Sequence, residues 1–305
     1  MPAEPPPLPD EERVADEQVA ALVRERFAAA RPEPSSFPAI ALQILNHAAD
    51  PGADVQELAR LVARDPALSA GVLSVANSPV YRGLMEVETV RDAVARLGLD
   101  ELGKVAAAVS ARTLFSPRQR AEHQAFAPRF SALFGHAVAV GSAAAAAALR
   151  RPDARADRAY LGGLLHDVGK SLALRALAGL VLDRRVVAPP PERVERVLDA
   201  VHVELGGEAH QIWGLPHYLT VLCVRHHDPA VPGEPEFVDL HLVRLASALA
   251  DLREPLWAAR AAREVAQSAA ALGVDPFAVR ALAAELRQAE ARADRAFSPA
   301  APATR

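Results

Sequence analysis

Apolar residues recur at intervals of three and four along most of the chain, while stretches that alternate with a period of two are short. The first spacing gathers apolar side chains on one face of a helix. The same segments are rich in Ala, Leu, Arg and Glu, which all favour helices. We therefore predict an all-α fold built from two packed helical subdomains.

Several helix ends are marked by local signals. Asp65 precedes Pro66, so a carboxylate stands at an N-cap and a proline at the first helical position. Asp275 and Pro276 repeat this arrangement just after Gly273, which suits the end of the preceding helix. These signals predict that one helix begins at Pro66 and another at Pro276.

A boundary between the subdomains is expected near residues 115–130. Pro117 interrupts one helix there, and the polar stretch RQRAEHQAF precedes the next. That next helix is rich in alanine, begins near Phe130 and ends at Pro152. The predicted segments are an unstructured proline-rich tail at 1–20, a first helical subdomain at 21–125, a second at 126–252, a C-terminal helical pair at 253–297 and an unstructured tail at 298–305.

Each helix of the C-terminal pair carries an apolar face at helical spacing. Packing against the second subdomain is the simpler interpretation of these faces, and a surface for a partner or a second copy is the alternative. The residues concerned are Ala262, Val265, Ala269 and Leu272 in the first helix, and Val279, Leu282 and Leu286 in the second.

Charge and composition narrow the class of protein. The formal net charge is −4, so the chain offers no general attraction for nucleic acid or for an anionic membrane. Cys223 is the single cysteine, which favours a reducing compartment. The start has no signal-peptide pattern, and no uninterrupted apolar run reaches the roughly 18 residues of a spanning helix. We expect a cytoplasmic protein without nucleic-acid or membrane partners.

A set of histidines and aspartates carries the candidate chemistry. Imidazole together with carboxylate is the ligand set of a divalent metal such as Fe, Mn, Zn or Ni. One or two ions are therefore the expected cofactor. The candidate metal ligands are His136, His166, Asp167, His202, His226, His227 and Asp251.

Lys170 lies four residues beyond His166 and three beyond Asp167, so it shares their helix face. A lysine there can pair with Asp167 or bind a phosphate beside the metal. The chain has only one other lysine, Lys104, and uses arginine elsewhere. Asp167 and Lys170 are the candidate catalytic residues. The alternative is that His166 is a hydrogen-bonded core histidine and Lys170 a surface lysine. This interpretation suits the short His166-Asp167 pattern when it is taken alone.

The ordered series His, His-Asp, His, His-His, Asp resembles the HD superfamily of metal-dependent phosphohydrolases, and in particular its HD-GYP branch. The resemblance implies that a first ion is held by His136, His166, Asp167 and Asp251. It also implies that Asp167 bridges to a second ion and that Lys170 contacts phosphate. The residues implied for the second ion are His202, His226 and His227.

The segment after the paired histidines departs from the HD-GYP pattern. That branch follows the pair with a glutamate and then a glycine-rich segment ending Gly-Tyr-Pro. Here the residues after His227 are DPAVPGEPEFVD, with neither feature. The departure argues against the cyclic-dinucleotide phosphodiesterase activity of that branch.

The first half is similar to the HDOD family, the HD-related output domain, and the similarity extends over about residues 25 to 252. Its marks include Asp65-Pro66-Ala67-Leu68, Ala76-Asn77-Ser78 and the second-half motifs LLHDVGK and RHHDP. We interpret the first-half motifs as architectural. The resemblance implies that the second subdomain is an HD-like helical bundle.

The same resemblance implies a bacterial signal-transduction protein that acts by binding. Its partner is an unknown signalling protein or a nucleotide ligand, and a homodimer is left open. The alternative is a metal-dependent phosphohydrolase, either a phosphodiesterase or a nucleotide phosphohydrolase, of unknown substrate.

Overall fold

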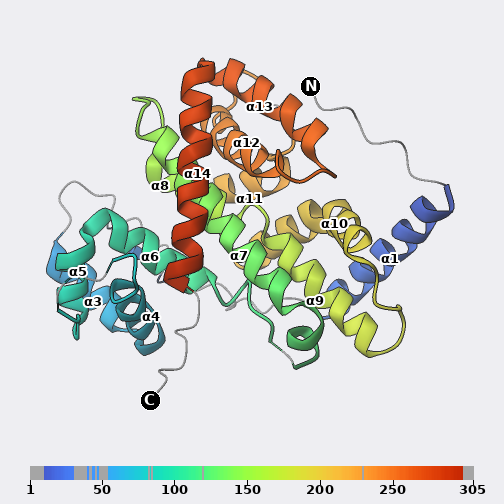
Figure 1. Ribbon diagram of the computed structural model, residues 1–305, viewed down its shortest axis with the longest axis horizontal. Helices are drawn as coiled ribbons and strands as arrows, with labels where there is room; N and C mark the ends of the chain where they lie inside the picture. Colours follow the sequence, from blue (N-terminus) through green and yellow to red (C-terminus); the bar gives the residue numbers. More distant parts are fainter. Residues whose placement is uncertain are drawn as a thin grey trace. The chain divides into compact units, whose positions relative to one another are not determined.

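The computed structural model describes residues 10–30, 40, 43–44, 47, 54–81, 83, 85–118, 120–228 and 230–297. Every regular element in these residues is a helix, as Figure 1 shows, so the predicted all-α class is confirmed. The described chain forms two compact units. One contains α1 and residues 113–286, and the other contains residues 54–112 with the end of the last helix.

The first unit is a bundle around α7, which packs against α8, α9 and α12. Helix α9 lies against α10, α11 contacts α8, α10 and α12, and α12 lies against α13. Apolar residues bury one face of each of these helices. The elements are α1 (Asp10–Ala29), α7 (Arg120–Ala148), α8 (Ala156–Leu165), α9 (Val168–Leu182), α10 (Pro191–Ile212), α11 (His217–Arg225), α12 (Phe237–Asp251), α13 (Ala258–Leu272) and the part of α14 (Pro276–Phe297) that extends to Leu286.

Helix α1 corrects the predicted N-terminal tail, because residues 10–20 are helical rather than unstructured. Residues 1–9 lie outside the described residues. The helix buries Val23 and Phe27 and packs against α9 and α10. Asp16 also pairs with Arg193 at 2.7 Å and Arg196 at 2.6 Å. Tertiary contacts of this kind stabilise a helix in a segment whose composition alone predicts no regular structure. They also group α1 with the second half of the chain.

The alanine-rich helix begins earlier than predicted. Helix α7 starts at Arg120, ten residues before Phe130, so the polar stretch expected as a linker is helical, with Pro128 inside it. The predicted end is close to the observed one at Ala148. The predicted tail at 298–305 lies outside the described residues.

The second unit contains α3 (Val55–Ala63), α4 (Pro66–Ala76), α5 (Val90–Leu97) and α6 (Leu99–Ala111), which pack on one another. The predicted cap is present, because Asp65 accepts hydrogen bonds from the amides of Ala67 and Leu68. Asn77 ends α4, and its side chain exchanges two 2.8 Å hydrogen bonds with the backbone of Val87. These contacts agree with an architectural role for the first-half motifs.

Two glycines let the helices of the first unit approach closely enough to bring their polar residues together. A side-chain carbon on Gly163 of α8 would lie 2.6 Å from backbone atoms of Gly141 in α7. A carbon on Gly169 of α9 would lie 2.7 Å from the carbonyl carbon of His202 and 2.8 Å from the amide nitrogen of Gly206. Only a residue without a side chain fits at such crossings.

Residues Phe126–Ala148 of α7 are long and apolar enough to cross a membrane by length and composition. In the structure 56% of the most apolar part of this segment is buried, and α7 packs on three other helices. This is the environment of a core helix.

Candidate metal centre

The candidate ligands converge from different parts of the first unit. Most of them stand at or near a helix end, where a side chain can turn toward a neighbouring helix. His136 lies in α7, His166 and Asp167 join α8 to α9, His202 lies in α10, His226 and His227 follow α11, and Asp251 is the last residue of α12.

Asp167 lies at the middle of the cluster. Its Oδ2 is 3.6 Å from His136 Nε2 and 3.5 Å from His166 Nε2. Its Oδ1 is 3.4 Å from His202 Nε2 and 3.5 Å from His226 Nε2. The two oxygens of one carboxylate therefore face two different pairs of histidines.

Three of the histidines are held in the same way, because Nδ1 donates a hydrogen bond to the backbone carbonyl three residues earlier. The pairs are His166 with Gly163 at 2.7 Å, His202 with Asp199 at 2.8 Å, and His226 with Cys223 at 2.8 Å. A carbonyl accepts but cannot donate, so the proton is on Nδ1. In the neutral rings Nε2 then carries a lone pair, as a metal ligand requires.

Burial keeps the rings of His166 and His202 neutral. It lowers the pKa of His202 to about 3 and brings the pKa of His166 well below its usual range, although Asp167 opposes both shifts. The pKa of His227 is also lowered, first by burial and then by the nearby His226. A neutral imidazole binds a metal ion without first releasing a proton.

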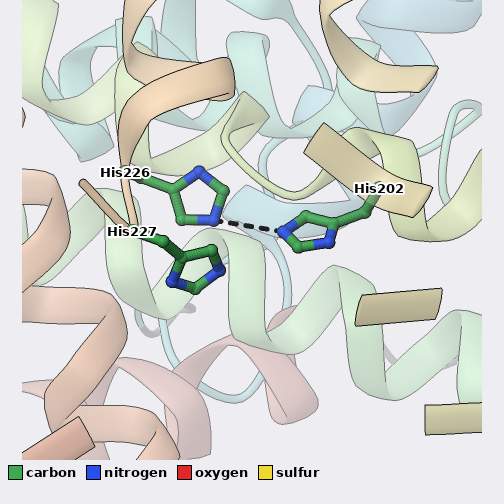
Figure 2. Close-up of side chains that lie close together, drawn as sticks. All are labelled: His202, His226 and His227. Atoms are coloured by element: carbon green, nitrogen blue, oxygen red, sulfur yellow. Dashed lines mark hydrogen bonds between the residues drawn. The ribbon is translucent and has the colours of Figure 1, made fainter. Parts of the chain in front are cut away.

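The Nε2 atoms of two pairs of histidines face one another at short range. His202 Nε2 lies 3.3 Å from His226 Nε2, as the dashed line in Figure 2 marks, and His136 Nε2 lies 3.4 Å from His166 Nε2. Nδ1 of His202 and Nδ1 of His226 each donate to a backbone carbonyl, so in this tautomer neither Nε2 carries a proton to share across the first contact. A tetrahedral ion with bonds of about 2.1 Å separates its ligand atoms by about 3.4 Å. The spacing therefore fits a cation between the rings.

Two groups of ligand atoms, each within 4.8 Å of one another, fall in the described residues. One consists of His136, His166 and Asp167, and the other of His202, His226 and His227. In the second group, Figure 2 shows the ring of His227 beside that of His226 and facing His202 from the same side. Among the described residues, Asp167 Oδ1 and His227 Nε2 are buried without a hydrogen-bond partner. Unsatisfied buried lone pairs of this kind suit the binding of a cation.

Lys170 donates to Asp167 Oδ2 at 2.6 Å, which is the predicted pairing. Burial opposes the charge on Lys170, but Asp167, Asp251 and Asp199 raise its pKa above the usual value. Burial would likewise raise the pKa of Asp167, yet the ammonium of Lys170 brings it well below its usual range. The pair is therefore an ammonium beside a carboxylate.

Asp251 stands apart from both ligand groups. Arg260 Nη2 lies 3.8 Å from Asp251 Oδ2. Burial raises the pKa of Asp251 to about 6, although Lys170 lowers it. Its role as a ligand of the first ion stays a prediction.

Three charged residues near the centre were missed by the sequence analysis. Arg260 of α13 stacks over Trp257 at 4.5 Å and donates from Nη1 to both oxygens of Asp199, at 3.0 and 2.8 Å. Glu264 of α13 lies 3.3 Å from His227 Nδ1. Glu264 lies on the buried face of an alanine-rich helix, and a buried carboxylate requires a partner. A glutamate in such a helix is the signal that could have indicated this residue.

Residues 35–229 match the family model of the HDOD domain. This segment is more than half of the sequence. The chain belongs to the HDOD family. The matched segment of this HDOD protein ends before Asp251 and before α13, so Arg260 and Glu264 lie outside it.

Solved structures share the fold. An HDOD domain protein of unknown function from Geobacter sulfurreducens is 26% identical, with 93% of this chain and 99% of that chain covered and a TM-score of 0.63. A candidate metal-dependent phosphohydrolase from Shewanella amazonensis SB2B is 20% identical, with 90% and 99% covered and a TM-score of 0.58. A candidate signal transduction protein from Marinobacter aquaeolei VT8 is 22% identical, with 90% and 64% covered and a TM-score of 0.58.

An uncharacterized protein of Treponema pallidum (strain Nichols) is 26% identical over 208 residues, which are 65% of this chain and 38% of that protein. The chain thus spans little more than a third of that curated relative.

Proposed function

We propose that this HDOD protein is a cytoplasmic signal-transduction protein that acts by binding and holds a divalent metal centre in its HD-like half. The observation that carries the metal centre is the set of imidazole lone pairs around Asp167, with His202 Nε2 and His226 Nε2 3.3 Å apart. Imidazole and carboxylate ligands suit Fe, Mn, Zn or Ni. His136 and His166 would hold one ion, the other three histidines would hold a second, and Asp167 would bridge them.

The charges around the centre support a phosphate-bearing ligand. The ammonium of Lys170 lies on one side of Asp167, and the guanidinium of Arg260 lies near Asp251. Arg260 Nε and Nη2 are buried without a hydrogen-bond partner among the described residues. Such donors suit phosphate oxygens, so a nucleotide is one proposed ligand and another signalling protein is the other.

A metal-dependent phosphohydrolase is the second candidate, favoured by the two pairs of histidines that face the two oxygens of Asp167. Two ions of this kind, when bound, activate water and neutralise charge on a phosphoryl group. Lys170 would hold a phosphate oxygen, and the buried rings would exclude bulk water from the centre. The changed segment after His227 favours binding without turnover.

Metal analysis of protein purified without added metal tests the centre. We expect one to two equivalents in the wild type and loss of both in Asp167→Ala, because Asp167 faces both pairs of histidines. Asp183→Ala is the matched control, since Asp183 ends the same helix and pairs with the exposed Arg26. Less than about a tenth of an equivalent, unchanged by Asp167→Ala, would refute the metal centre.

Turnover separates the two candidates. The metal-loaded protein is incubated with bis(p-nitrophenyl) phosphate, cyclic dinucleotides and nucleoside triphosphates in the presence of Mn²⁺ or Fe²⁺. Hydrolysis that is lost in Asp167→Ala would establish the second candidate. If the metal-loaded protein hydrolyses none of these compounds, the phosphohydrolase candidate is excluded for these substrates and the binding role is supported.

A further inference from the structure

Helix α13 brings a buried carboxylate to the metal centre from outside the matched family segment. Glu264 is only 5% exposed, and its Oε1 lies 3.3 Å from His227 Nδ1. A buried carboxylate is costly unless it is paired. The charge of Arg244, a buried residue of α12, also acts on Glu264. Glu264 therefore contacts a histidine of the candidate centre and interacts electrostatically with a buried cation.

The contact with Glu264 decides which nitrogen of His227 faces the centre with a lone pair. An ionised carboxylate only accepts hydrogen bonds, so Nδ1 of His227 carries the proton and donates it. The lone pair is then on Nε2, which is buried and has no hydrogen-bond partner among the described residues. His227 belongs to the same ligand group as His202 and His226.

The other two histidines of that group, His202 and His226, are each held by a hydrogen bond from Nδ1 to the backbone carbonyl three residues earlier. His227 differs, because the group that fixes it is a side chain from another helix. A carboxylate in this place also makes the imidazole a stronger ligand.

We propose that Glu264 is a positioning residue that orients His227 toward the second metal ion, so that α13 is part of the metal centre. The inference rests on the proposed metal function. It assigns to the C-terminal helical pair a role beyond packing. It also predicts that the two ions differ, since only the second depends on α13.

Titration of the metal-free, full-length protein with Co²⁺ tests the proposal, with stoichiometry from elemental analysis and ligand geometry from the visible absorption of Co²⁺. Glu264→Ala should weaken the second Co²⁺ by about 10–100-fold and leave the first unchanged. Glu264→Gln keeps an acceptor for the Nδ1 proton, so it should fall between Glu264→Ala and the wild type. Glu285→Ala, in α14, is the matched control, because Glu285 pairs with Arg150 instead.

A double-mutant cycle separates orientation from a general structural effect. In a His227→Ala background, Glu264→Ala should cause no further loss of Co²⁺ affinity, because its effect passes through that ring. Equal weakening of both ions by Glu264→Gln, or additive losses in the cycle, would overturn the proposal. A wild type that binds two Co²⁺ ions and a Glu264→Ala variant that binds them equally well would also overturn it. A wild type that binds no Co²⁺ would instead refute the metal centre itself.

Discussion

Replacing Gly169 with alanine tests whether the close approach of α9 and α10 sets the metal centre. The added carbon would lie 2.7 Å from the carbonyl carbon of His202, whereas ordinary contact begins at 3.4 Å. The contact with the carbonyl oxygen of His202 would be closer still, so the two backbones must separate by more than about 0.7 Å. Asp167 lies two residues before Gly169, so this separation acts directly on the 3.4 Å between Asp167 Oδ1 and His202 Nε2.

The expected effect is larger on metal binding than on folding. Metal–ligand distances tolerate only about 0.2 Å, so a shift of more than about 0.7 Å removes His202 from the second ion and should weaken its binding by about 100-fold. Overpacking against backbone costs about 3 kcal/mol, and alanine returns about 1 kcal/mol in a helix. The net loss in the free energy of unfolding is then about 2 kcal/mol.

Co²⁺ titration and urea unfolding in the presence of a chelator measure the two effects separately. Gly179→Ala in the same helix is the control, because its added carbon meets only the end of the Arg26 side chain, at 3.0 Å. That end can move, so Gly179→Ala should bind Co²⁺ normally and be as stable as the wild type or more so. Wild-type Co²⁺ affinity in Gly169→Ala would show that the crossing does not set the centre.

Two further predictions concern stability. Burial lowers the pKa of His210 from 6.5 to about 4, so the unfolded state binds the extra proton first and stability is lost as pH falls from 6.5 towards 4. His210→Gln should reduce the loss between pH 7 and pH 5 by about 2 kcal/mol in urea unfolding without metal, and an unchanged pH dependence would contradict this. Asn77→Ala removes both hydrogen bonds to Val87 and should cost about 2 kcal/mol with the Co²⁺ stoichiometry unchanged. A lower stoichiometry would disprove a purely architectural role for Asn77.

The helical class could be predicted because its signals are local, and the sequence also indicated the six residues that the structure brings into two groups. Helix periodicity and caps are encoded within a few residues of each position, as at Asp65 and Gly273. The ligands were indicated by residue type and order along the chain. That order says which side chains are available, and the structure brings all but Asp251 into the two ligand groups.

The interhelical details could not be predicted, because they depend on the rotation of one helix against another. The predicted apolar face of α13 included Ala262 and Val265, which are only half-buried, while Glu264 and Ser268 are buried. The observed face is turned by a fraction of a helical turn, and this turn brings Glu264 to His227. The close crossing at Gly169 likewise has no signal in the sequence beyond the glycine itself.

The position of Cys223 gives this protein a built-in reporter. Its backbone carbonyl holds His226, its side chain is fully buried, and burial raises the pKa of the thiol above its usual value. Only the thiolate reacts readily, so modification has to wait until α11 moves away from its neighbours. Cys223 is the single thiol in 305 residues. The rate at which an added reagent alkylates it therefore measures how often α11 opens. Metal ions that bind the closed form would lower the alkylation rate of Cys223, so metal binding can be followed without adding a label to the protein.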